Sequence, residues 1–129
     1  MENKVTKTVL DRILGAPDVL AKLPTAKYKV DRLSEELGTD VVFTLQALPY
    51  GRAHDMERLS AESDIQILLA GCVDPDLKDG ALMNAFPGCV TPADAVKHLL
   101  LPGEIADLAA AVERLSGYRK TTITEVKNA

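Results

Sequence analysis

Three titratable residues, His54, Asp55 and Glu57, form the densest group of ionisable side chains in this sequence. Imidazole titrates near neutral pH, so such a group could serve in acid–base catalysis. However, apolar residues at helical spacing between Pro49 and Leu59 place all three on the polar face of an amphipathic helix, where mixed charges are normal. The pattern therefore favours a solvated helix face over a catalytic site.

The two cysteines, Cys72 and Cys89, are the other candidates for chemistry. A nucleophilic cysteine needs a neighbouring base and an electropositive setting, and the sequence does not bring His98 to Cys89. Together with His54 and His98 the cysteines could supply four metal ligands, but their spacing differs from the paired spacing of structural zinc sites. We predict free, partly buried thiols, with no catalytic residue, no cofactor and no metal.

The length and composition fit one ordinary globular domain. The chain has 129 residues, 47% hydrophobic and 26% charged, with a net charge of −4. Such an acidic balance argues against nucleic-acid binding, which needs clustered Lys and Arg. The start of the chain lacks the apolar core of a signal peptide, and no apolar run approaches a transmembrane length. We therefore predict a cytoplasmic protein with residues 1–129 as a single domain and no nucleic-acid or membrane partner.

The first part of the chain combines a small helical unit with a pair of strands. Apolar residues at helical spacing up to Gly15, and a second helix start at Pro17, predict two short helices within residues 1–24. Alternation of apolar and polar residues then predicts two strands, and the segment Glu35–Asp40 between them has the residues of a turn. We expect a β-hairpin over residues 27–48 that packs one face on helices.

The rest of the chain has a helical period. Helix-start signals, namely capping residues or a proline at the first helical position, recur in order along it. They stand at Ser63, Asp79, Thr91 and Pro102. The run from Ser63 to Val73 is apolar nearly all round, which predicts a central buried helix. The expected fold class is α+β, mainly α-helical, with one β-hairpin packed against a bundle of short helices and residues 119–129 as a polar tail.

Three small residues, Ala106, Ala110 and Ala111, are predicted to lie on the last helix, on the side away from its apolar stripe. Small side chains permit the close approach of another helix, either within the fold or from a second subunit. Alanine is also simply a good helix former on a surface. The alanine side is therefore a candidate partner or oligomer face, with the surface interpretation left open beside it.

The helix stops and starts form an ordered series of motifs. They are Val73-Asp74-Pro75-Asp76-Leu77 after an apolar helix, Leu82-Met83-Asn84-Ala85-Phe86, a Thr91-Pro92 start, Leu99-Leu100-Leu101-Pro102-Gly103-Glu104-Ile105, and Leu115-Ser116-Gly117-Tyr118. In this order they resemble the XkdN-like tail assembly chaperones of tailed phages and prophages, and the resemblance covers about half of the chain. These motifs are architectural and contain no group suited to catalysis.

The resemblance implies a non-enzymatic role in phage tail assembly. Proteins of this family are thought to hold the tape-measure protein in the host cytoplasm before tail-tube subunits polymerise around it, and to be absent from the finished virion. The resemblance thus implies tape-measure and tail-tube proteins as partners, and a homo-oligomer is expected. Small acidic domains that self-associate could keep long apolar segments of such a partner soluble.

Two other functions are compatible with the same residues. The chain could be a regulatory or adaptor protein of a mobile element that acts through protein–protein contacts. An enzyme is the third alternative, and it requires Cys89, His98 and His54 to converge in one pocket.

Overall fold

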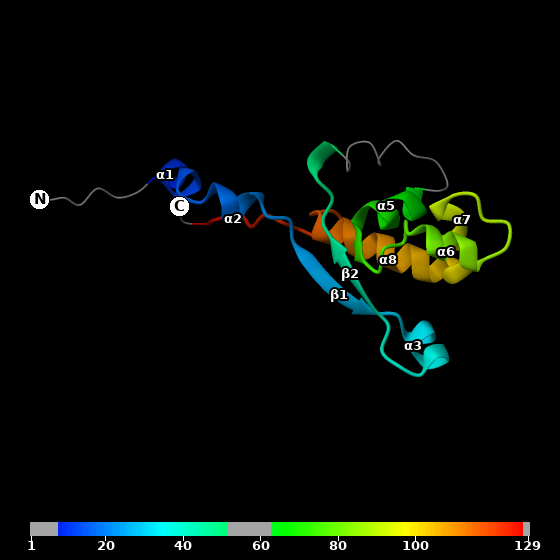
Figure 1. Ribbon diagram of the computed structural model, residues 1–129. Coiled ribbons are helices and arrows are strands. Elements are labelled where there is room, and N and C mark those ends of the chain that lie inside the picture. Colours follow the sequence, from blue (N-terminus) through cyan, green and yellow to red (C-terminus); the bar gives the residue numbers. More distant parts are fainter. Residues whose placement is uncertain (1–7, 52–62, 128–129) are drawn as a thin grey trace, which may run out of the picture.

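The computed structural model describes residues 8–51 and 63–127 (Figure 1). A three-stranded antiparallel sheet packs against helices to form the body of the molecule. Two short helices near the N-terminus project away from this body. The elements are α1 (Val9–Leu14), α2 (Pro17–Ala21), β1 (Thr25–Lys29), α3 (Asp31–Leu37), β2 (Val42–Gln46), α5 (Ser63–Gly71), β3 (Cys72–Asp74), α6 (Gly80–Ala85), α7 (Pro92–Leu99) and α8 (Pro102–Leu115). This architecture confirms a mainly helical α+β fold.

The sheet has the order β1-β2-β3, so β2 is central and β1 is an edge strand. β1 and β2 pair in register from Thr25 opposite Gln46 to Lys29 opposite Val42. The buried residues Phe43 and Leu45 alternate with more exposed neighbours along β2, as expected for a strand with one face on the core. The core therefore lies on a single face of the sheet.

Helices α5 and α8 lie side by side beneath the sheet and supply half of the buried core residues. The largest fully buried side chains are Phe43, Leu45, Leu68, Val96 and Val112, which come from β2, α5, α7 and α8. The apolar stripe predicted for the last helix is confirmed, because Ile105, Leu108, Ala109 and Val112 are buried on α8. The core is thus built from aliphatic residues with a single phenylalanine among its largest members.

Two serines join helices to strand backbone in the same way. The Ser34 hydroxyl donates to the Val30 carbonyl oxygen (2.8 Å) and accepts from the Val41 N–H (2.8 Å). On α8, the Ser116 hydroxyl donates to the carbonyl oxygen four residues earlier (2.8 Å) and accepts from the Leu48 N–H (2.8 Å). Each serine satisfies a strand-end amide that would otherwise lack a helix or sheet partner. They fix both ends of β2 against the body.

The connection between β1 and β2 differs from the predicted hairpin turn. The strands are antiparallel partners as expected, but helix α3 occupies most of the segment between them, and the chain turns only after it, at Gly38 (φ 72°). Leu33 and Ser34 of α3 are buried, so packing of a helical face stabilises α3 where a tight turn would leave that apolar surface exposed. The sheet also contains a third strand, β3, which the hairpin prediction lacked.

The predicted central helix is correct at its start and wrong at its end. α5 begins at Ser63, but it ends at Gly71 rather than Val73, and Cys72 to Asp74 form β3. β3 pairs with the second edge of β2, with Cys72 opposite Leu45. Pairing satisfies backbone groups of β2 that would otherwise be buried without partners, and this tertiary gain overrides the local helical pattern.

Several local predictions are confirmed by the caps. Thr91 begins α7 with a capping box completed by Asp94, and Asp79 caps α6. Gly15 ends α1, and Pro17 is the first residue of α2. Most of the helix predicted from Pro49 to Leu59, with His54, Asp55 and Glu57, lies outside the described residues.

Candidate protein-interaction surfaces

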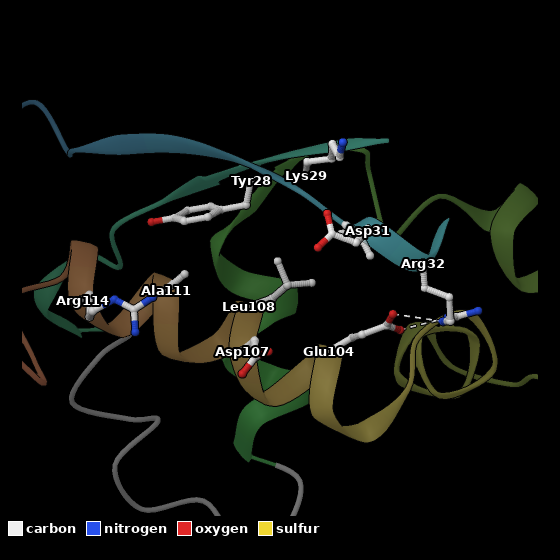
Figure 2. Close-up of a pocket in the computed structure, with 10 residues that line it drawn as sticks. Tyr28, Lys29, Asp31, Arg32, Glu104, Asp107, Leu108, Ala111 and Arg114 are labelled. Carbon is white, nitrogen blue, oxygen red and sulfur yellow. Dashed lines mark hydrogen bonds and ion pairs between the residues drawn. The ribbon is translucent and has the colours of Figure 1, made fainter. Parts of the chain in front are cut away.

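A groove of about 430 Å³ lies between the edge strand β1 and helix α8 (Figure 2). Its floor is apolar, formed by Tyr28, Leu108 and Ala111, and charged side chains surround the floor. The full lining is Tyr28, Lys29, Val30, Asp31, Arg32, Glu104, Asp107, Leu108, Ala111 and Arg114. An apolar floor with a charged rim is the arrangement that protein-recognition grooves use.

A two-pronged ion pair closes the groove at the start of α3. The Arg32 Nε donates to Glu104 Oε2 (3.0 Å), and its Nη2 donates to Glu104 Oε1 (2.9 Å). The same Nη2 also donates to the Leu99 carbonyl oxygen (3.0 Å), and Glu104 Oε1 accepts from the Leu101 N–H (2.7 Å). Figure 2 shows this pair at one end of the groove and Arg114 at the other. Arg32 therefore ties α3 to the junction between α7 and α8.

The ion pair shifts the pKa of both groups. The hydrogen bonds from Arg32 hold the pKa of the Glu104 carboxyl below its usual value, although partial burial acts in the opposite direction. The bond to Glu104 in turn raises the pKa of Arg32. Both groups are thus charged at neutral pH, and the pair holds two opposite charges at this end of the groove.

The two N-terminal helices form a second candidate surface, the N-terminal arm (residues 9–21). Its six large apolar side chains are 49–75% exposed, and neither helix has a buried residue. They are Val9, Leu10, Ile13, Leu14, Val19 and Leu20. Figure 1 shows the arm projecting away from the sheet and the helices. Exposed apolar surfaces of this kind are typical of contact sites, which makes the arm a candidate interaction surface.

The structure separates the three alanines of the predicted partner face. Ala106 is exposed and Ala110 is half-buried, but Ala111 is only 2% exposed and lies in the floor of the groove. The prediction from sequence places Ala111 beside Ala110 on the side away from the apolar stripe, but one step along a helix rotates the side-chain direction by about 100°. Ala106 and Ala110 are left as the outer small residues.

The candidate catalytic residues that the structure describes are Cys72, Cys89 and His98. The Cys72 thiol donates to the Pro75 carbonyl oxygen (3.3 Å), and burial raises its pKa to about 11, so it is a protonated, poor nucleophile at neutral pH. The ring of His98 stacks on Phe86 with centroids 5.6 Å apart. Cys89 is a half-buried free thiol. Within residues 8–51 and 63–127, no group of three His, Cys, Asp or Glu side chains is arranged to hold a metal ion.

Sequence reasoning missed the groove because its walls are far apart in the chain. Arg32 and Glu104 are separated by 72 positions, and nothing in either local sequence indicates the other. One signal was available: Glu104, Leu108 and Ala111 follow one another at helical spacing and so define one face of α8. The spacing predicts that these residues share one face of the helix. Only the fold shows that β1 lies opposite this face.

The part of the chain that the structure describes is a small α+β fold with two candidate interaction surfaces, the groove and the N-terminal arm. It also contains no helix long and apolar enough to cross a membrane.

The comparisons identify the family. The model of the phage XkdN-like tail assembly chaperone family matches residues 49–129, so the chain belongs to this family, and the resemblance found in the sequence motifs is confirmed. The crystal structure of the protein yqbn has a similar fold, with a TM-score of 0.65 and 18% sequence identity over 89% of this chain and 99% of yqbn. No curated protein sequence matches the chain.

Proposed function

We propose that this chain is a non-enzymatic chaperone that binds the tape-measure protein of its phage before the tail tube polymerises, and that the tail-tube protein is its second partner. The single observation that carries this proposal is the N-terminal arm, whose large apolar side chains are exposed to solvent. Family membership supports a role in tail assembly over a regulatory or adaptor role elsewhere in a mobile element.

The arm has the dimensions of a helix-in-groove contact. α1 has six residues and α2 has five, whereas isolated helices shorter than about 12–15 residues are marginal in water. A partner helix with an apolar stripe would bury Leu10, Ile13 and Leu14, which lie at helical spacing on one side of α1. The same contact would stabilise both short helices of the arm. Several chaperones along one tape-measure protein would gain avidity from modest individual contacts.

The test is capture of the tape-measure protein encoded by the same phage. Co-expressed full-length chain, carrying a tag, should retain the tape-measure protein in the soluble fraction. The double variant Leu10→Gln/Leu14→Gln should reduce this capture by roughly tenfold or more, because two apolar contacts are lost. Glutamine keeps the net charge and nearly the helix propensity of leucine.

A matched control is Leu37→Gln at the end of α3. Leu37 is 68% exposed, close to the 66% of Leu14, but it lies on the body. The control should capture the tape-measure protein as the wild type does. Failure of the wild-type chain to bind would reject the proposal, and equal losses from Leu37→Gln and the arm variant would reject the arm as the contact. Purified tail-tube protein, added to the complex, should displace the chaperone or join it in a stable assembly.

We also propose that the side of α8 bearing Ala106 and Ala110 contacts a helix of a partner or of another copy. Ala106→Arg should lower the apparent mass or the partner capture while leaving the helical circular dichroism signal unchanged. Unchanged sedimentation together with unchanged capture would reject this contact.

A further inference from the structure

The outer side of β1 is an edge of the sheet. The Pro24 carbonyl oxygen accepts from the Ala47 N–H (2.9 Å), and the Val30 N–H donates to the Val41 carbonyl oxygen (2.9 Å). Backbone groups alternate in direction along a strand, so the intervening odd-numbered residues direct theirs away from β2. These are Thr25, Lys27 and Lys29, which together form the β1 edge. A row of such groups is a template for one more strand.

Helix α8 extends beneath the place that this strand would occupy. Its groove-lining residues recur at helical spacing and form one face: Glu104, Asp107, Leu108, Ala111 and Arg114. Figure 2 shows this face across the groove from β1. A strand added to the β1 edge would lay every second side chain on this face, as Phe43 and Leu45 of β2 already pack toward the core.

The C-terminal tail (residues 121–126) has the composition of a strand without forming one. Its sequence is Thr-Thr-Ile-Thr-Glu-Val, in which five of the six residues are β-branched, and it forms neither helix nor strand. Ile123 is 82% exposed and Val126 is 74% exposed. β-Branched residues favour the pleated, half-buried surface of a sheet. The tail therefore has the composition of a strand, but it is not paired with a neighbouring strand.

The C-terminal cap of α8 directs the tail away from its own sheet. The Tyr118 N–H donates to the Glu113 carbonyl oxygen (2.9 Å), and the chain reverses hand at Gly117 (φ 96°), as in a Schellman motif. Arg119 then ties the start of the tail to α8, because its Nε donates to Glu113 Oε1 (2.7 Å). Figure 1 shows the tail leaving the body in the direction of the N-terminal arm. In this direction the tail leads away from the β1 edge of its own molecule.

We propose that the C-terminal tail of one copy adds as an antiparallel strand to the β1 edge of a second copy. In the register that fits best, Ile123 lies opposite Tyr28 and enters the apolar floor of the groove. Two residues farther along the tail, Glu125 then lies over the end of the groove that holds Arg114, and the two charges are complementary. Strand addition to an open edge is a common mode of peptide recognition.

This register also assigns the hydrogen bonds. Thr122 lies opposite Lys29 and Thr124 lies opposite Lys27, so these tail residues exchange backbone hydrogen bonds with the β1 edge. The N–H of Thr121 points away from β1. Reciprocal exchange of two tails gives a closed dimer, and one-way exchange gives an open chain. Tail exchange involves only copies of this chain, and it does not require the proposed tape-measure contact.

A charge-swap experiment on purified full-length chain tests both the contact and its intermolecular nature. Sedimentation velocity over a wide concentration range should show self-association of the wild type. Glu125→Arg and Arg114→Glu should each weaken it by about fivefold or more, since each variant places like charges together. An equimolar mixture of the two variants should regain the wild-type association, because every tail then faces a groove of opposite charge on the other variant.

The hydrogen-bond register has its own matched pair of variants. Thr124→Pro removes an N–H that points at the β1 edge and should weaken association by roughly tenfold, whereas Thr121→Pro removes an N–H that points away and should have little effect. In the wild type, hydrogen exchange at the amides of Lys27 and Lys29 should slow as concentration rises. Circular dichroism confirms that each variant is folded.

Three results would overturn the proposal. The first is a wild-type chain that is monomeric at every concentration. The second is a mixture of Glu125→Arg and Arg114→Glu that associates no better than either variant alone. The third is association that is unaffected by Thr124→Pro. A tail that pairs with its own β1 edge would give the first result together with concentration-independent protection of Lys27 and Lys29.

Discussion

The substitution Gly71→Ala tests a close approach of α5 to α8 in the core. Gly71 ends α5 where it crosses α8, and a Cβ atom placed there would lie 2.6 and 2.7 Å from the two methyl groups of Val112 and 3.1 Å from the Gln46 carbonyl oxygen. Ordinary van der Waals contacts at such a Cβ begin near 3.4 Å. The valine methyls must therefore move by close to an ångström, although Val112 is 0% exposed and its β-branched side chain has one strongly preferred rotamer in a helix.

Overpacking of this kind costs about 1–3 kcal/mol. Alanine recovers at most about 1 kcal/mol relative to glycine through backbone entropy, and less at the last residue of a helix. Gly71→Ala should thus lower the free energy of unfolding by about 1–2 kcal/mol, with a fall in Tm of roughly 3–8 °C for a chain of this size. Urea denaturation followed by circular dichroism measures the change, and an unchanged m-value shows that it reflects stability.

Two further variants isolate the cause of the Gly71→Ala effect. Gly103→Ala is the control, because a Cβ at Gly103 meets no atom within 4 Å, so this change should be neutral or slightly stabilising. Val112→Ala removes the two methyls, so the pair Gly71→Ala/Val112→Ala should be less destabilised than the sum of the single variants by about 0.5–3 kcal/mol. A Gly71→Ala protein as stable as wild type, or strictly additive variants, would refute the reasoning.

Three other predictions concern single contacts of the body. Ser34→Ala leaves the Val41 N–H without its acceptor and should cost about 1–3 kcal/mol of unfolding free energy in urea. Thr91→Ala removes the hydroxyl of the α7 capping box and should cost about 0.5–2 kcal/mol by the same assay, with Thr91→Ser close to wild type. Because Arg32 lowers the pKa of Glu104, the stabilisation from this pair is present above the unfolded pKa of ~4.3 and is lost as pH falls through the folded-state pKa. Glu104→Gln should therefore be less stable near neutral pH and lose less stability on acidification, and an acid limb identical to wild type would contradict this.

The parts of the fold that were predicted correctly have local causes. A capping box such as that of Thr91 is complete within four residues, and a proline at the first helical position acts on its own φ angle. The apolar stripe of α8 likewise repeats within one element. Such signals depend on a few neighbouring residues, and they can be interpreted without knowledge of what packs above them.

The errors arose where a distant partner decides the local structure. β3 forms because β2 offers it an edge, whereas Cys72 and Val73 taken alone continue the apolar run of α5. For α3 a local signal did exist, since Val30, Leu33 and Leu37 recur at helical spacing, but the turn residues from Glu35 to Asp40 outweighed it. The groove was beyond prediction because it joins a strand to a helix more than 70 positions away.

The two segments proposed to bind other molecules, the N-terminal arm and the C-terminal tail, both lie outside the core. Neither helix of the arm has a buried residue, and the apolar residues of the tail are exposed, so association at these segments does not require the body to open. Hydrogen bonds nevertheless orient each segment where it leaves the body. The Pro24 carbonyl oxygen bonds to the Ala47 N–H at the end of the arm, and Arg119 bonds to Glu113 at the start of the tail. Directed segments on a rigid body lose less conformational entropy on association than free ones. In the proposed role, partners therefore bind to and leave these two segments without unfolding of the body.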